Sequence, residues 1–456
     1  MNNIKPSLMV LTISWFLVSA VAGGAQTLTD ALINAYRNSP QLKSERATLR
    51  STDEGTAQAR AALRPSLNAK LTGSQIYSFS TGSFTDAASA ELGLKLLLWD
   101  GGNTRLGVEV ARLNVELARQ ALIDVEQQVL LNAATAFVDM RRDAEFLELA
   151  ENNRRVIAKQ VQAAKDRFEV GEARRTDVSQ AEARLAGALS TVALRQGTLE
   201  ISREAFHVAT GVYPGNLQPL PALPRIPSAV SAVDSIALRS HPTILRARNL
   251  ADIAKVNVLR AEAAMLPKVE LSGGLGINAN SAGGDSASLS VTGTMPLYQG
   301  GALASAHRQA LALQEKSKSD IQLSGLLVSQ NAHRFWAQLQ IARASIVARQ
   351  KEVRASRVAL RGIREEADLG ARTTLDVLDA EAALFEAEAN AVAAKRDEYV
   401  AVYSLLSAMG LLTVKHLALG IKTYDPKVNF NQVKTAPAPT NRGKLLDKVF
   451  KRAGKK

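Results

Sequence analysis

The segment Leu369–Glu381, LGARTTLDVLDAE, closely repeats an earlier segment, Val170–Glu182, VGEARRTDVSQAE. The two segments lie 199 residues apart, and each places a glycine between two long runs of helix-forming residues. A glycine at such a place predicts a left-handed turn, because residues with a Cβ rarely adopt that backbone conformation. The sequence therefore predicts two long helical hairpins, one in each half of the chain.

The same spacing recurs elsewhere, which indicates an internal duplication. Trp99–Gly102 (WDGG) matches Tyr298–Gly301 (YQGG), again 199 residues apart. Nearer the beginning of the chain, Pro40 matches Pro242 at a spacing of 202 residues. The change of three residues in the spacing falls in a predicted strand–loop–strand segment, where insertions are tolerated.

Both repeats have the same predicted order of elements. A helix of about 35 residues ends before a proline, and two strands, a Gly-Gly pair, a helix of nearly 70 residues, a glycine turn and a second helix of about 35 residues follow. A basic tail, residues 419–456, follows the second repeat. We interpret it as solvated, and contact with anionic lipid or peptidoglycan is the alternative. The predicted ranges are 1–25 for a signal peptide, 26–210 for the first repeat (β-hairpin about 66–99, helices 103–170 and 176–210), 211–228 for a Pro-rich linker, 229–418 for the second repeat (β-hairpin about 268–298, helices 302–369 and 374–410) and 419–456 for a basic disordered tail.

The leader has the three parts of a secretory signal peptide. Lys5 precedes an apolar run over 8–22, and small residues allow cleavage after Ala22 or Ala25. An uncleaved N-terminal anchor is the alternative. We therefore expect an exported protein.

The predicted strands alternate apolar residues with small or polar ones. In the second repeat Val269, Leu271 and Leu275 fall on one face. Each strand has about 9–12 residues, the length that crosses a bilayer at a tilt. Trp99 and Tyr298 occupy the same repeat position at a strand end, where an aromatic residue suits a membrane–water interface. The alternative is one face of a soluble β-sandwich that ends in an ordinary aromatic residue.

The long helices carry apolar residues at a seven-residue spacing, which predicts coiled-coil packing. One row in the first long helix is Val108, Val115, Leu122, Val129 and Ala136. Such a helix is roughly 100 Å long, and two helices of about 35 residues stacked end to end match that length. The pattern predicts a cylinder of long helices interleaved with stacked short pairs.

Four strands in one chain are too few to close a membrane barrel. An open sheet in lipid leaves its edge hydrogen bonds unmade, and the smallest closed barrels have about eight strands. Two chains would make a barrel filled by its own side chains, whereas three chains would make twelve strands and a lumen. We therefore expect the strands to be completed by other copies of the chain.

The composition excludes several classes of function. The chain of 456 residues has no cysteine, which rules out disulfides, thiolate metal sites and cysteine nucleophiles. Of the net charge of +13, residues 422–456 carry +8, so we expect no nucleic-acid partner. No common catalytic or phosphate-binding motif is present, and the five histidines have no partners at ligand spacing. We expect no enzyme, no cofactor and no metal site.

With these features the sequence resembles the TolC-type outer membrane efflux proteins, also called the outer membrane factor family. Leu369–Glu381 is similar to the family's helix-turn motif V-G-x-R-T-x-x-D-V-L-x-A-E, and Val170–Glu182 is a looser match. The resemblance covers about residues 28–418. It implies a mainly α protein with a membrane β-barrel, in which a homotrimer forms a 12-stranded barrel in the outer membrane and an α-helical coiled-coil barrel that extends across the periplasm.

The resemblance also implies a function. The protein would be the outer membrane channel of a tripartite efflux or type I secretion system. Its partners would be a periplasmic adaptor protein, an inner-membrane pump of the RND or ABC type, and outer membrane lipid. The alternative is a periplasmic coiled-coil scaffold without a pore. The cargo stays open between drugs, a polypeptide and a polysaccharide.

Roles for the tip residues follow from the resemblance. In a trimer, Asp376 and Asp379 would form two rings of three carboxylates that favour cations at a constriction, because residues three apart share a helical face. The alternative is a capped helix with a solvated acidic turn, in which Thr373 caps the following helix and Asp376 stands at the capping-box position. The residues expected at the tip turns and in adaptor docking are Gly171, Gly370, Thr373, Leu375 and Val377.

A gate latch is the third implied feature of the tips. Arg372 would pair with Asp177 and Thr176 across neighbouring hairpins, as in the family's closing latch. The alternative is an exposed ion pair worth under about 1 kcal/mol. Some members have a tyrosine three residues before the second tip glycine, where this chain has Ala367, so we expect a differently built latch.

Overall fold

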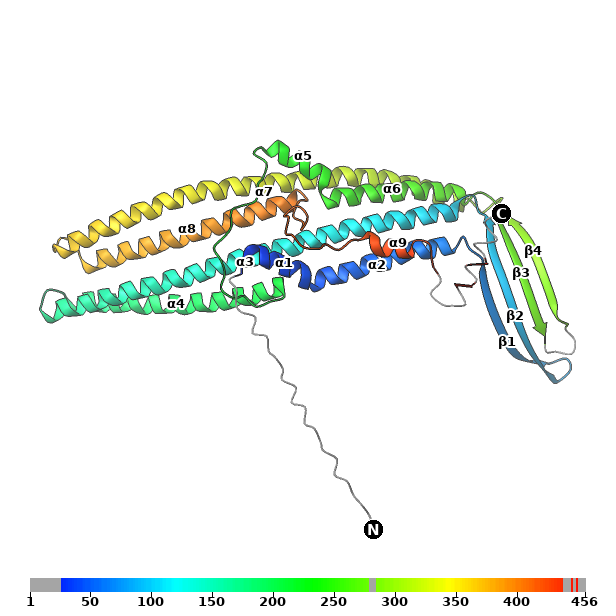
Figure 1. Cartoon of the computed structure of the whole chain (residues 1–456), viewed down its shortest axis with the longest axis horizontal. Helices are drawn as coiled ribbons and strands as arrows, with labels where there is room; N and C mark the ends of the chain where they lie inside the picture. The colour runs from blue at the N-terminus through cyan, green and yellow to red at the C-terminus, as the bar shows by residue number, and fades with distance from the viewer. Residues whose placement is uncertain (1–25, 279–283, 438–443, 446–447, 450–456) are drawn as a thin grey trace, which may run out of the picture.

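The computed structural model is an elongated bundle of helices with a β-sheet at one end (Figure 1). It describes residues 26–278, 284–437, 444–445 and 448–449, so the predicted signal peptide lies outside the described residues. The helices are α1 (Leu28–Asn38), α2 (Pro40–Ala61), α3 (Asn103–Glu169), α4 (Arg175–Thr210), α5 (Val230–Ser240), α6 (Pro242–Ala263), α7 (Ala302–Asp368), α8 (Thr374–Ala408) and α9 (Lys427–Val433). The strands are β1 (Ser66–Ser78), β2 (Ser83–Trp99), β3 (Lys268–Asn278) and β4 (Ser286–Thr294).

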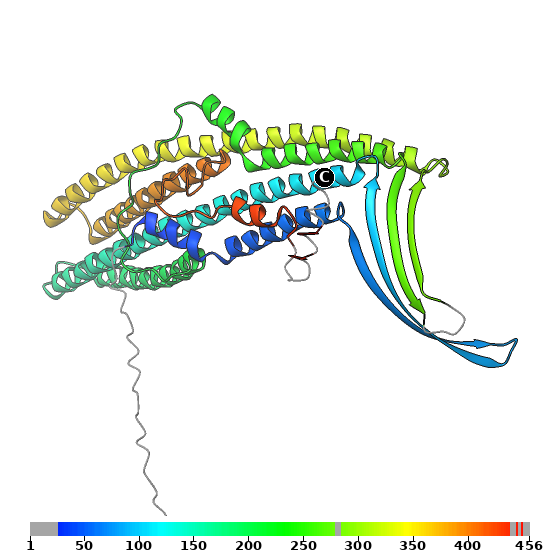
Figure 2. The same ribbon diagram turned by 45° about the vertical axis from the view of Figure 1, so that its right-hand side comes forward.

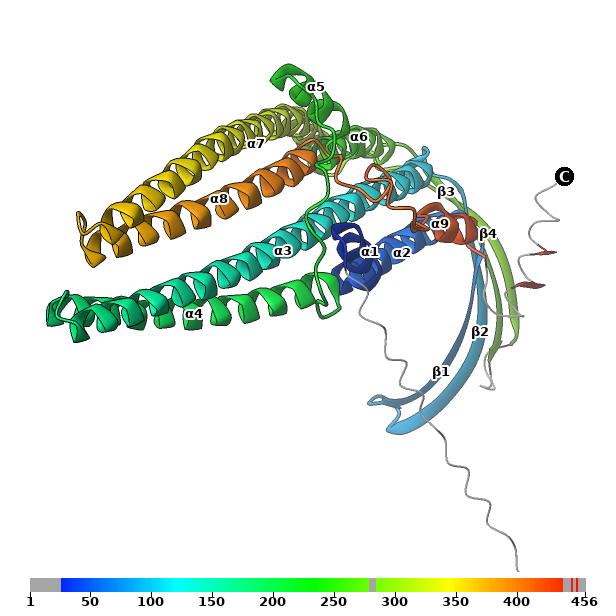
Figure 3. The same ribbon diagram turned by 60° about the vertical axis from the view of Figure 1, so that its left-hand side comes forward.

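Two antiparallel helical hairpins make up most of the molecule. Helices α3 and α7 have 67 residues each, and they return as α4 and α8. Helix α8 packs against α3, so α4 and α7 form the two outer edges of the bundle (Figures 1 and 3). The main core lies midway along the bundle and includes the fully buried side chains of Phe137 and Phe206. Among the described helices, none has a stretch both long and apolar enough to span a bilayer.

The prediction of a single helix before each pair of strands is wrong, because two helices lie there in each repeat: α1 and α2 in the first, α5 and α6 in the second. Pro40 begins α2 and Pro242 begins α6, and proline is favoured at this first helical position since its missing N–H would have no partner there. The preceding residue caps each new helix. Ser39 Oγ accepts a hydrogen bond from the backbone N–H of Leu42 at 3.3 Å. His241 Nδ1 accepts a hydrogen bond from the backbone N–H of Thr243 at 3.2 Å.

The returning helix of each hairpin ends against this break. Gly211 and Gly410 have φ angles of +74° and +73°. A Cβ on Gly211 would lie 2.7 Å from the Cβ of Asn38, and one on Gly410 would lie 2.8 Å from both His241 Cα and Ser240 O. Both repeats therefore use the same tight joint, which sets α4 in line with α2 and α8 in line with α6 (Figure 1).

The four strands form one antiparallel sheet in the order β1-β2-β3-β4, with β1 and β4 at its edges. Strands β1 and β2 have 13 and 17 residues, which is longer than the predicted strands. Among the described residues, the last pair between β2 and β3 is Ser89 with Asn278, whereas pairing between β1 and β2 continues to Ser78 with Ser83. The first β-hairpin therefore projects beyond the described strands of the second, as Figure 2 shows.

The register divides the sheet into an apolar face and a polar face. The apolar face consists of Leu67, Ala69, Leu71, Ala90, Leu92, Leu94, Leu96, Leu271, Leu275, Ile277, Leu289 and Val291. The polar face includes Asn68, Lys70, Thr72, Glu91, Lys95, Glu270, Ser272, Ser288, Ser290 and Thr292. On the apolar face Leu71, Leu289 and Val291 are 84%, 75% and 64% exposed, so the described part of the single chain does not cover this face.

The two predicted interface aromatics differ in their positions. Trp99 is the last residue of β2, as predicted. Tyr298 does not end a strand, because β4 stops at Thr294, two residues before Pro296. Proline has no N–H for a strand ladder, which explains the early end.

The prediction that the tail is disordered from residue 419 is wrong for the described residues up to 437. Helix α9 packs on α2, where Asn429 Nδ2 donates to Asp53 Oδ2 at 2.8 Å. The backbone N–H of Tyr424 donates to the Tyr36 hydroxyl at 3.0 Å, and the guanidinium of Arg46 lies between the two tyrosine rings, 4.8 and 5.3 Å from their centroids. Charge dominates the composition of the tail, but these few aromatic contacts order its first part.

Candidate functional site

Both hairpins turn at the end of the molecule farthest from the sheet (Figures 1 and 3). Gly171 and Gly370 have φ angles of +81° and +78°, which are left-handed as the sequence predicts. In both turns the glycine N–H donates to the carbonyl three residues back at 3.0 Å, and the next N–H donates to the carbonyl five residues back at 2.8 Å. This is the same helix-ending motif in both repeats.

The helices that follow the turns are capped by carboxylates. Thr373 Oγ1 accepts from Asp376 N at 3.2 Å, while Asp376 Oδ2 accepts from Thr373 N and Thr373 Oγ1, both at 2.8 Å. In the first repeat Asp177 Oδ2 accepts from Arg174 N at 3.0 Å. The bonds from Thr373 lower the pKa of the Asp376 carboxyl. The capping box is therefore present, and Asp376 is held in its charged form.

Two ion pairs join the tips of the two hairpins. Arg184 on α4 donates to Asp379 Oδ1 on α8 at 2.6 Å, and Arg167 on α3 lies 3.5 Å from Asp368 on α7. Asp379 therefore has a counter-charge within the single chain. Arg184 was not among the predicted site residues, because the residue 199 positions later is alanine and the duplication therefore does not mark this position.

Arg372 has a partner within its own turn. Its Nε donates to Glu366 Oε2 at 2.7 Å, and this bond, together with the charges of Glu366 and Asp376, raises the pKa of Arg372. The predicted partner Asp177 caps α4 in the other hairpin. Within one chain, Arg372 is thus held by Glu366.

The predicted docking residues differ in exposure. Leu375 is 37% exposed, but Val377 is 4% exposed, so its side chain is buried and unavailable at the surface of the single chain. Val170 and Leu369, which cap the two long helices, are 70% and 86% exposed and were not predicted as docking residues. The apolar surface of the tips is therefore formed mainly by the turn residues themselves.

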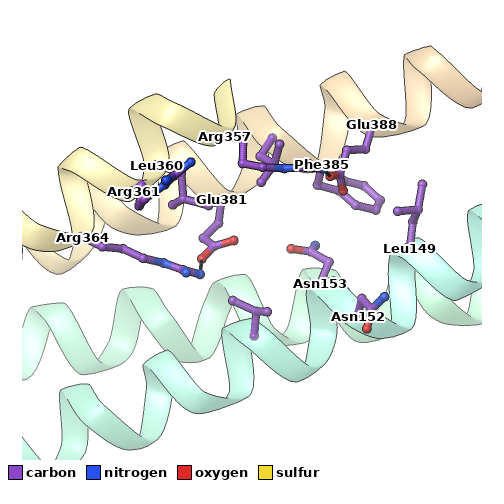
Figure 4. Close-up of a pocket in the computed structure, with 12 residues that line it drawn as sticks. Leu149, Asn152, Asn153, Arg357, Leu360, Arg361, Arg364, Glu381, Phe385 and Glu388 are labelled. Atoms are coloured by element: carbon purple, nitrogen blue, oxygen red, sulfur yellow. Dashed lines mark hydrogen bonds and ion pairs between the residues drawn. The ribbon is translucent and has the colours of Figure 1, made fainter. Parts of the chain in front are cut away.

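A cavity of about 430 Å³ lies along the seam between α3 and the second hairpin, as Figure 4 shows. Its wall includes the buried Glu381, which accepts from Arg364, and Glu388, which accepts from Arg357 at 2.7 Å. The Arg364–Glu381 pair has an equivalent in the first repeat, where Lys165 lies 2.8 Å from Glu182. The 199-residue spacing relates both members of this pair to those of the other repeat, so the sequence itself marks the pair as duplicated.

The two repeats also match one family model separately. The model described as outer membrane efflux protein matches residues 32–212 and 234–411, one match in each repeat. The chain belongs to the outer membrane efflux protein family. Members of this family are channel proteins of the outer membrane, and in this member the long helical hairpins form the periplasmic part.

Individual relatives cover nearly the whole chain of this efflux protein. It is 33% identical over 432 residues to the outer membrane efflux protein BepC of Brucella suis, which covers 92% of this chain and 93% of BepC. It is 26% identical over 402 residues to the outer membrane protein TolC of Vibrio cholerae, covering 85% and 92%. Among solved structures, CusC superposes with a TM-score of 0.75 at 20% identity over 84% of this chain and 91% of that chain, which shows a shared fold.

Proposed function

We propose that three copies of the chain form an outer membrane channel that conducts solutes or polypeptides from the periplasm or from an inner-membrane pump to the exterior. The four-stranded sheet carries this proposal, because it has an exposed apolar face, a polar face and two open edges. Closing twelve such strands turns the apolar faces toward lipid and the polar faces toward a lumen. The channel is passive, and energy comes from an adaptor-linked pump of the RND or ABC type.

The helical part supports the same closed ring of copies. Exposed apolar residues recur at a seven-residue spacing on α4 and at twice that spacing on α7, where Asp320 and Arg334 occupy the positions between, so they form rows on opposite edges of the bundle. These residues are Leu194, Ile201 and Val208 on α4 and Leu313, Leu327 and Ile341 on α7. Pairing α4 of one copy with α7 of the next would bury both rows and continue the α-helical barrel.

Adjacent residues on the two faces of β1 test this proposal. Leu71→Lys places a charge on the lipid face, where it costs about 2–4 kcal/mol near the bilayer midplane. We therefore expect it to lower the yield of trimers in detergent and of channels in planar bilayers by at least about tenfold. Thr72→Lys, its neighbour on the lumen face, should assemble normally and change only the conductance.

The scaffold without a pore predicts a different outcome. Both positions would then face water, so both variants would behave like the unmodified chain, and a bilayer would stay electrically silent. A water-soluble monomer with no conductance would also contradict the channel proposal.

At the tips we propose a closed aperture held by contacts between copies. Arg372 would exchange Glu366 for Asp177 and Thr176 of the neighbouring copy, and Asp376 would line the opening. The adaptor would dock on the exposed apolar residues Leu369 of the turn and Leu375 at the start of α8, which cross-linking from position 369 can test.

Arg372→Ala is expected to increase conductance at least about twofold, because three inter-copy contacts worth up to about 1 kcal/mol each would no longer favour the closed state. Single-channel recording measures this directly. Arg354→Ala, which removes an exposed arginine from α7 and leaves the turn that holds Arg372 intact, serves as the control and should leave the conductance unchanged. Equal conductance in both variants would argue against the latch.

A further inference from the structure

The first joint, at Gly211, and the second joint, at Gly410, are held by equivalent hydrogen bonds. In the first joint Asn38 Nδ2 donates at 3.2 Å to the carbonyl of the residue before the glycine. In the second joint Ser240 Oγ donates to the corresponding carbonyl at 2.8 Å. Each bond ties the end of a returning helix to the residues that precede the proline-led helix, so a change at the start of α2 or α6 reaches the end of α4 or α8.

The two joints differ in the side chain that caps the proline-led helix. Ser39 and His241 lie at equivalent positions, 202 residues apart. A serine hydroxyl keeps the same hydrogen-bonding capacity near neutral pH, whereas a histidine ring changes its charge there. His241 Nδ1 accepts from Thr243 N at 3.2 Å, and a ring nitrogen accepts only while it carries no proton. The second joint therefore depends on the neutral imidazole.

The surroundings of His241 favour this neutral form. Burial lowers the pKa of the imidazole, and the charge of Asp124 on α3 raises it by a smaller amount. Asp124 also lies 3.8 Å from Arg246 of α6, which offsets its charge. A proton on His241 would in addition place a positive charge at the positive end of the α6 dipole. Because its pKa in the folded protein is lowered, the capped joint is stable above about pH 6.5 and weakens as the pH falls through that lower value.

The other ionisable groups around the second joint do not weaken it in acid. Glu126 on α3 accepts at 2.8 Å from a backbone N–H of the segment after α8, and burial raises the pKa of this carboxyl, so acid favours its buried form. His333 on α7 lies 3.7 Å from Asp234 of α5, and a proton there would complete an ion pair. Arg239 of α5 stays charged, His416 is exposed, and the last turn of α8 has no ionisable side chain. Protonation of the capping imidazole is the change that removes a bond.

We propose that acid loosens the second joint and leaves the first joint intact. A proton on His241 Nδ1 leaves Thr243 N–H without its acceptor, which frees the start of α6 and, through the bond from Ser240, the end of α8. The first joint keeps its serine cap at the same pH. These contacts lie within one chain, so the inference does not depend on assembly of the channel. In the proposed channel acid would act on the second hairpin alone, which becomes freer to move at the end away from its tip.

Hydrogen exchange of the purified full-length protein, from about pH 7.5 to about pH 5, tests this proposal. Protection is the exchange rate of each amide relative to an unstructured peptide at the same pH, which removes the intrinsic effect of pH on exchange. We expect the protection of amides 243–245 to fall about fivefold in acid, because a helix cap contributes about this factor. Amides 409–411, which donate to carbonyls at the end of α8, should lose protection over the same range.

Two substitutions keep a cap and remove the titratable ring. His241→Ser introduces the residue that the first repeat has at this position, and His241→Asn introduces another favoured capping residue. In either variant the protection of amides 243–245 and 409–411 should not change with pH. Amides 42 and 43, which donate to Ser39, are the matched control in the unmodified chain and should keep their protection in acid.

The possible outcomes are distinct. Constant protection of amides 243–245 in the unmodified chain overturns the proposal. The same acid-induced loss in both His241 variants shows that another group titrates, and its removal by Glu126→Gln would assign it to that carboxyl. A loss at 243–245 with none at 409–411 confines the effect to the cap and contradicts a loosened joint. An equal loss at amides 42 and 43 contradicts the difference between the two joints.

Discussion

Gly410→Ala is expected to destabilise the folded protein by about 2–5 kcal/mol, the largest loss we expect from any single methyl group added to the chain. The glycine has a φ of +73°, and its added Cβ would lie 2.8 Å from His241 Cα and from Ser240 O. Both contacts are to main-chain atoms, which cannot rotate away. Thermal unfolding of the purified protein, followed by helical circular dichroism, measures the loss.

Alanine substitutions at two other glycines serve as comparisons for this prediction. Gly362→Ala adds a Cβ within α7 that meets nothing within 4 Å, so stability should be unchanged or higher by about 0.5–1 kcal/mol. Gly211→Ala should lose less than Gly410→Ala, because its added Cβ would meet one atom within 3.0 Å, the Cβ of Asn38 at 2.7 Å, whereas the Cβ added at Gly410 would meet three main-chain atoms within that distance. Similar losses for Gly362→Ala and Gly410→Ala would show that the joint does not fix the packing.

Asp376→Asn combined with Asp379→Asn is expected to remove cation selectivity. In the proposed trimer, each of the three Asp376 carboxylates, at about 8 Å in water, stabilises a permeating cation by roughly 0.5 kcal/mol. Together they favour cations over anions by about tenfold. The cation-to-anion permeability ratio should therefore fall about tenfold toward unity. The reversal potential across a planar bilayer with a salt gradient measures this ratio.

The single variants should differ, because the two carboxylates have different partners. Asp379 faces Arg184 at 2.6 Å, which offsets its charge, so Asp376→Asn should account for most of the loss. The opposite order would contradict this assignment. If the carboxylates serve only to cap the helix, selectivity will survive the double substitution.

The same contacts predict a pH dependence. A carboxylate is charged above its folded-state pKa, and Thr373 lowers the pKa of Asp376. Selectivity should therefore persist as the pH falls to about 4, near the ordinary pKa of an aspartate. Thr373→Val removes the hydroxyl bond, so its selectivity should decline at a higher pH than that of the unmodified channel.

Local patterns in the sequence predicted much of this fold. The glycine turns, the long helices and the alternation of the strands each depend on residues close together in the chain. The breaks before Pro40 and Pro242 were missed because proline at the first turn of a helix satisfies the same pattern as an unbroken segment. The ordered part of the tail was missed because two aromatic residues, Tyr424 and Phe430, are hidden in a composition dominated by charge.

In the candidate site too, features that depend on neighbouring residues were predicted, and features that depend on distant residues were not. The threonine–aspartate spacing of 373 and 376 predicted a local capping box, and the structure contains it. Arg184 and Asp379 are 195 residues apart and belong to different repeats, so neither spacing nor duplication could pair them. Burial of Val377 depends on how the two hairpins meet, which no single segment encodes.

The length of the first β-hairpin sets the depth at which the proposed channel sits. Beyond Leu71 and Ala90, the face that is apolar nearer the helices carries Gln75 and Asp86, and Gln75 Nε2 donates to Asp86 Oδ1 at 2.9 Å. A carboxylate on the lipid side is costly in hydrocarbon, so this end of the hairpin must stand in water outside the cell. The outer leaflet therefore ends below Asp86, and three charged prongs, one from each copy, rise from the mouth of the channel.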